Sequence, residues 1–104
     1  MLIVGSGNLV HHLREYAWDR QAVEPQKWAV RFEESAKAWM LSVNFDPLVN
    51  NNEQGPDAMK AVPTPDHYLP LLYVLAQHRA GDNIMFPVEG FDGGSMSMLA
   101  VQVG

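Results

Sequence analysis

The chain has 104 residues, of which 47% are hydrophobic, so it is long enough for one small domain with a core. Its formal net charge of −5 argues against nucleic acid and anionic membranes as partners. It has no cysteine and no apolar run of the roughly 20 residues that a membrane helix needs. A disulfide framework, a thiolate metal site and a cysteine nucleophile are excluded, and we expect a soluble cytoplasmic protein.

The first residues have the pattern of a strand, a glycine turn and a helix. Residues 2–5 are short, apolar and β-branched, which predicts a buried strand. After the turn, Asn8 suits the N-cap of a helix over residues 9–16. The dinucleotide-binding fingerprint begins in this way, but Val10 stands where its third glycine belongs. A nucleotide-binding module is therefore the weakest interpretation.

His11 occupies the third position of this expected helix. The positive end of the helix dipole disfavours imidazolium there, and a neutral imidazole can accept a proton. His11 is therefore a candidate general base. His12 would point about 100° away around the same helix. For His12, and for His78 near the end of a later helix, a hydrogen-bonded or solvated side chain is the simpler interpretation.

The clearest helical pattern runs over residues 26–43. Glu33 and Lys37 form an i,i+4 pair that we expect on its polar face. An aromatic stripe is far more often core than a cofactor site, so we assign the other face to the core. That stripe comprises Trp28, Ala29, Phe32, Ala36, Trp39, Met40 and Val43.

The segments around this helix are short. A polar connection is expected over residues 17–25. A short helix is expected after Asp46 as its cap, and another helical turn is expected over residues 57–61. Residues 50–56 are a polar loop with Gly and Pro, and are too few to link two domains.

The end of the chain predicts two strands, over residues 84–88 and 95–103. The second begins with Ser95 and Ser97 on one face, and these serines either line a cleft or are simply exposed. With the strand at residues 2–5, the pattern predicts an α/β fold, a fragment of a larger α/β domain with helices packed on a small mixed sheet.

The run from residue 63 to residue 73 places His67 between a loop and an apolar segment. The Thr-Pro pair before it suits a helix start. Pro70 is incompatible with an uninterrupted helix. Either the helix kinks at Pro70, or a short turn over residues 64–69 precedes a helix that begins there. Both alternatives place His67 at a helix entrance.

Two histidines at helix entrances, His11 and His67, can face one cleft at the end of a sheet, where α/β proteins bind ligands. A metal site needs three or more ligands, and no His-x-x-x-His, cysteine pair or carboxylate cluster completes the set. From composition and spacing alone, the chain is a small α/β unit with two candidate site histidines.

Three motifs, in order along the chain, resemble the C-terminal portion of the class III extradiol ring-cleavage dioxygenases. The most similar branch is the single-chain DOPA-dioxygenase-like group. The first motif is residues 5–13 (GSGNLVHHL), and the second is residues 63–73 (PTPDHYLPLLY). The third, supporting motif is residues 87–90 (PVEG) with residues 94–98 (GSMSM).

This resemblance implies a role for each of two residues. His11 matches the family's acid–base residue beside the metal, and His67 matches a metal ligand. His12 stands where a polar residue such as Asn is expected, so it is given no role, and no substrate-binding residue is assigned. The implied metal is Fe(II), and Zn²⁺ can occupy such a site without supporting oxygen chemistry. The implied substrates are a catechol and dioxygen, and the ring bond that is cut lies beside the two hydroxyls.

The family's other metal-binding histidines lie in an N-terminal part that has no counterpart here. The expected strand at residue 2, with nothing before it to pair with, agrees with this. We therefore expect residues 1–104 to be the C-terminal part of a single catalytic domain, with weak metal binding and no turnover alone. Its partner would be the missing N-terminal part or a second copy. The alternative is a non-catalytic remnant or interaction module that associates through an exposed sheet edge.

Overall fold

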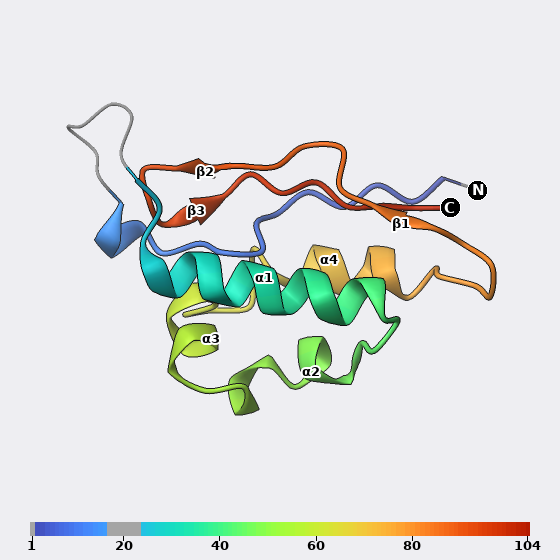
Figure 1. The fold of residues 1–104 in the computed structure, drawn as a ribbon, viewed down its shortest axis with the longest axis horizontal. Coiled ribbons are helices and arrows are strands. Elements are labelled where there is room, and N and C mark those ends of the chain that lie inside the picture. Colours follow the sequence, from blue (N-terminus) through green and yellow to red (C-terminus); the bar gives the residue numbers. More distant parts are fainter. Residues whose placement is uncertain (1, 17–23) are drawn as a thin grey trace.

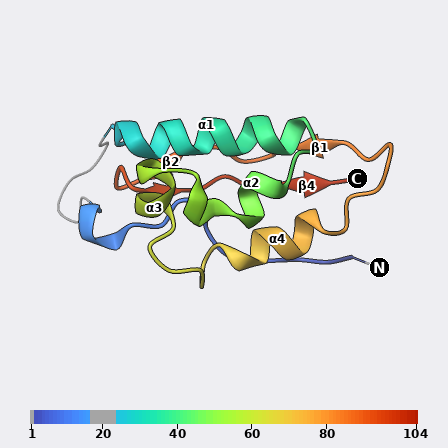
Figure 2. The ribbon, with the colours of Figure 1, turned by 90° about the horizontal axis from the view of Figure 1, so that it is seen from below.

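The computed structural model describes residues 2–16 and 24–104, so most of the expected connection over residues 17–25 lies outside it. In these ranges, four α-helices lie on one side of two small antiparallel sheets (Figures 1 and 2). β1 pairs with β4, and β2 pairs with β3. The predicted fold class, helices packed on a small sheet structure, is confirmed. The helices are α1 (Lys27–Leu41), α2 (Asp46–Val49), α3 (Pro56–Ala61) and α4 (Leu69–Leu75), and the strands are β1 (Ile84–Met85), β2 (Phe91–Asp92), β3 (Met96–Ser97) and β4 (Gln102–Val103). Two 3-10 turns, Leu13–Glu15 and Asn51–Glu53, complete the set.

α1 forms within the predicted range and supplies much of the core. Five residues of the predicted stripe are buried: Trp28, Ala29, Phe32, Ala36 and Met40. The helix ends in a Schellman motif, in which the Asn44 N–H donates to the Trp39 carbonyl and the Val43 N–H donates to the Met40 carbonyl. Val43 takes the left-handed conformation that this motif requires, with φ 56°, and is half exposed rather than part of the core.

The short helices follow the sequence signals closely. α2 begins at Asp46, which is its first helical residue and not the predicted cap, because Phe45 is the N-cap. α3 begins one residue before the predicted Asp57. α4 begins at Leu69, so Pro70 lies in its first turn, where the missing N–H has no helical partner to lose. A separate turn precedes it, because the N–H groups of Tyr68 and Leu69 both donate to the Pro65 carbonyl. Of the two alternatives, the turn followed by a new helix is correct.

The predictions for residues 2–16 are wrong. Residues 2–5 are extended but join no sheet, and Leu2 and Val4 are exposed instead of buried. The helix over residues 9–16 is absent except for one 3-10 turn. Residues 8–12 instead run beside β3, where the Ser97 N–H donates to the Val10 carbonyl and the His12 N–H donates to the Ser95 carbonyl. These tertiary hydrogen bonds outweigh the local preference for a helix.

The strand predictions at the end of the chain are right in position and too long. Only residues 84 and 85 of the run 84–88 form β1. The run 95–103 divides into β3 and β4, which belong to different sheets, so no single mixed sheet forms. Among the described residues, none of the helices has the length and apolar character needed to cross a membrane.

Candidate functional site

The structure brings His11 and His67 into direct contact. Their imidazole rings stack with centroids 3.8 Å apart and planes inclined by 16°. His11 comes from the extended segment beside β3 and is half-buried, whereas His67 comes from the turn before α4 and is exposed. Two side chains from opposite halves of the chain therefore form one pair.

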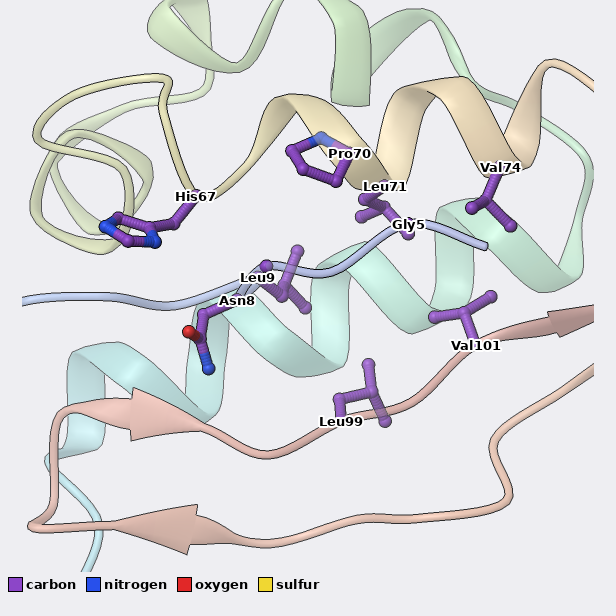
Figure 3. A pocket seen from close by; sticks show the side chains of 10 residues that line it. Gly5, Asn8, Leu9, His67, Pro70, Leu71, Val74, Leu99 and Val101 are labelled. Carbon is purple, nitrogen blue, oxygen red and sulfur yellow. The ribbon is translucent and has the colours of Figure 1, made fainter. Parts of the chain in front are cut away.

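The backbone around His67 is held by the glycine-rich segment before His11. The Asn8 N–H donates to the His67 carbonyl at 2.7 Å. This segment passes between α4 and the stretch joining β3 to β4, which carries Leu99 and Val101 (Figure 3). A Cβ on Gly7 would overlap the His67 carbonyl, and one on Gly5 would lie 2.8 Å from the Pro70 carbonyl oxygen. These glycines therefore allow a close approach of two backbones rather than the turn that was expected.

The backbone of His11 is also fixed on both sides. Its N–H donates to the Ala61 carbonyl at 2.9 Å, and the residue forms a β-bridge with Met96. Because His11 is on no helix, the dipole argument for its basicity does not apply. Burial and the neighbouring His67 lower the pKa of His11 instead, so a neutral imidazole able to accept a proton is still favoured.

The serines of the last segment are buried against the segment that carries His11, and they line no cleft. Ser95 and Ser97 are fully buried. The Ser95 hydroxyl donates to the His12 carbonyl at 2.6 Å, and the Ser97 hydroxyl donates to Glu33 at 2.7 Å. The Asn8 side-chain amide donates to the Ser97 carbonyl at 2.7 Å. Sequence reasoning assigned Asn8 to a helix cap, and only the alternation of the two serines indicated that they share a face.

A cavity of about 450 Å³ opens beside the pair. It is lined by His11, His12, Leu13, Arg14, Pro63, Thr64 and His67. A smaller cavity of about 70 Å³ is lined by residues that include His67, Pro70 and Leu99 (Figure 3). Small-molecule sites typically occupy about 300–1,000 Å³, so the larger cavity has the size of such a site.

The other two histidines lie apart from this contact. His12 lines the larger cavity, and its ring lies 3.8 Å from a carboxylate oxygen of Glu15. The Nε2 atom of His78 lies 3.1 Å from the Asp82 carbonyl oxygen, which agrees with the simple interpretation of a hydrogen-bonded side chain.

The described residues do not complete a metal centre. Within residues 2–16 and 24–104, no group of three or more His, Asp or Glu side chains is placed to hold an ion. The stacked rings of His11 and His67 cannot coordinate one ion together, because their in-plane lone pairs lie in nearly parallel planes. At most one imidazole of the pair is available as a ligand.

Comparisons with known sequences and with solved structures each found a relative of the chain, whereas no family model matches it. Over 107 aligned residues it is 44% identical to 4,5-DOPA dioxygenase extradiol of Escherichia coli K12, in an alignment that covers all of this chain and 39% of that protein. The crystal structure of the uncharacterized protein JW3007 from Escherichia coli K12 superimposes with a TM-score of 0.84 and 44% identity, covering 95% of this chain and 41% of the other. The chain thus spans about two fifths of the length of these relatives. Over its whole length, the chain is therefore similar to part of an extradiol dioxygenase.

Proposed function

We propose that the chain supplies the His11/His67 part of the active site of a dioxygenase that opens catechol-type rings beside their hydroxyls. The name of the Escherichia coli relative supports the reaction class. The observation that carries the proposal is the stacked pair, because its geometry suits two different roles and not two ligands of one ion.

In this proposal, His11 is the acid–base residue. Its lowered pKa favours the neutral ring, which accepts a proton from a catechol hydroxyl in the adjacent cavity and returns one later. His67 supplies one imidazole to a ferrous ion, and the described residues make no hydrogen bond to its ring nitrogens. The ion, when bound, supplies the redox chemistry with dioxygen, for which Zn²⁺ has no accessible redox states.

The remaining ligands must come from outside the described residues. We propose that they belong to the three fifths of the family fold that this chain does not match, or to a second copy of the chain. The isolated chain should then bind the ion weakly and should not open a catechol ring.

An anaerobic titration with ferrous iron tests the metal assignment. We expect weak binding that His67→Ala abolishes and that His78→Ala, a change away from the pair, leaves unchanged. Tight stoichiometric binding that depends on His67 would show that the chain or its oligomer completes the site. Binding that survives His67→Ala would contradict the role of His67.

A chimera tests the reaction. The chain would replace the matching part of the Escherichia coli relative, and ring opening would be followed as the yellow product after iron loading. Activity should require both His11 and His67 and should tolerate His78→Ala. A folded chimera without activity would favour a second candidate, a non-catalytic interaction module, which the lack of a third ligand among the described residues also favours.

A further inference from the structure

Glu33 is a buried carboxylate that the proposed chemistry does not use. The sequence predicts it on the polar face of its helix, paired with Lys37, but only 8% of the residue is exposed. Lys37 instead forms an ion pair with Glu89. Burial raises the pKa of Glu33, and a buried carboxylate is costly unless it is hydrogen-bonded. A buried carboxylate at this position therefore needs a hydrogen-bond partner.

Ser97 is the hydrogen-bond partner of Glu33. The Ser97 hydroxyl donates to Glu33 Oε1 at 2.7 Å and accepts the N–H of Leu99 at 3.1 Å. Because Ser97 is only 1% exposed, water cannot replace Glu33 as the acceptor. The carboxylate therefore fixes the direction of the hydroxyl, and with it the side-chain rotamer of Ser97.

The backbone of Ser97 connects to the segments that carry both histidines. Its N–H donates to the carbonyl of Val10, the residue before His11. Its carbonyl accepts the side-chain amide of Asn8, whose own N–H donates to the His67 carbonyl. Each of these three bonds is 2.7–2.9 Å long. A continuous series of hydrogen bonds thus runs from Glu33 on α1 to the backbone of the two segments that carry the rings.

We infer that Glu33 is a positioning residue for the stacked pair of His11 and His67, acting through Ser97. It does not line the cavity beside the rings. Removing its acceptor leaves a buried hydroxyl unsatisfied, and Ser97 must turn or shift to recover a partner. Either movement disturbs the bonds to Val10 and Asn8 and separates the rings. The inference concerns the pair itself, so it stands or fails independently of the proposed dioxygenase reaction.

Solution NMR of the metal-free chain tests this at one fixed pH. A stacked pair gives NOEs between the ring protons of His11 and His67 and upfield ring-current shifts. Glu33→Met keeps the length of the side chain without an acceptor and should abolish both signals. Glu33→Gln keeps an acceptor oxygen for the Ser97 hydroxyl and should preserve them.

Two controls separate positioning from a general loss of stability. Met40→Ala removes a fully buried side chain farther along α1, so it should lower the urea midpoint and leave the ring signals intact. Glu34→Met makes the same chemical change at the exposed neighbouring position and should alter neither measurement.

A folded Glu33→Met chain that keeps its inter-ring NOEs would overturn the inference. If that variant does not fold, Ser97→Ala removes the same link from the other side and should separate the rings. The wild-type chain provides an independent check, because a buried, bonded Ser97 hydroxyl proton must exchange slowly and show an NOE to Glu33. A rapidly exchanging hydroxyl would also overturn the inference.

Discussion

The Asn8 N–H donates to the carbonyl of His67 across 2.7 Å, and this bond joins the first and second sequence motifs. It places the glycine-rich segment directly against the turn that carries His67. The bond is possible because Gly7, the preceding residue, has no Cβ to strike the same carbonyl. The geometry of the histidine pair therefore depends on a glycine outside the pair.

Gly7→Ala should destabilise the chain and disturb the ring stack. The new Cβ meets backbone rather than a flexible side chain, and overpacking of this kind typically costs about 1–3 kcal/mol. Urea unfolding measures the first effect, and NOEs between the imidazoles measure the second. Ser6→Ala, at the exposed neighbouring position, should change stability by less than about 0.5 kcal/mol. If Gly7→Ala and Ser6→Ala have equal free energies of unfolding, the close approach of Gly7 to the His67 carbonyl is refuted.

His67→Ala should raise the pKa of His11 in the metal-free chain. Burial is the main cause that lowers this pKa, and the charge of His67 is the second. Removing His67 eliminates the second cause and exposes the His11 ring, so both effects act in the same direction. A titration of the His11 ring protons by NMR measures the change, with His78→Ala as the matched histidine deletion. An unchanged or lowered value in a folded His67→Ala chain would contradict the assigned causes.

Glu33 should make stability depend on pH in the acid range. Because its pKa is raised on folding, the folded state binds more protons than the unfolded state above the ordinary glutamate value of about 4.3. The free energy of unfolding contributed by this group should therefore fall as pH rises from that value through the folded-state pKa. The Glu33→Gln variant should lack this decrease in the free energy of unfolding with rising pH.

Urea unfolding at several pH values, with the wild-type chain and Glu33→Gln in parallel, measures the difference in slope. Glu34→Gln makes the same change at the exposed neighbour and serves as the control. If the Glu33→Gln curve runs parallel to that of the wild type, burial of this carboxylate does not carry the energetic cost inferred from the structure.

Val43→Gly should stabilise the chain. A β-branched residue with φ 56° costs roughly 1–2 kcal/mol, and glycine avoids this at a smaller entropic cost, so the expected net gain is about 0.5–1 kcal/mol. Val43 is half exposed, so little burial is lost. Val49→Gly, at an exposed helical position, should instead destabilise by roughly 0.3–0.5 kcal/mol. Thermal unfolding of both variants should show shifts of opposite sign.

The parts of the fold that the sequence predicts well depend on local patterns. The stripe of α1 repeats within one helix, and the position of Pro70 restricts the start of α4 to a few residues. Each signal lies within the element that it predicts. The α/β class follows from such signals even though the strands are shorter than expected.

The segment around His11 could not be predicted in this way. Asn8 and the residues after it suit a helix start, and nothing nearby opposes that interpretation. Their actual partners, Ser95 and Ser97, lie near the other end of the chain. The burial of Glu33 could not be predicted for the same reason, because its hydrogen-bond partner Ser97 is 64 residues away. The resemblance identified His11 and His67 as candidates, but their stacking is a property of the folded chain.

The pairing of residues 8–12 with β3 also has a kinetic consequence. The bond from Asn8 to Ser97 spans 89 residues of sequence, so nearly the whole chain must be closed into a loop before it forms. Loop closure of this length is entropically costly, and such long-range contacts slow folding. We therefore expect α1 to form early and the imidazole pair to appear only in the slowest refolding phase.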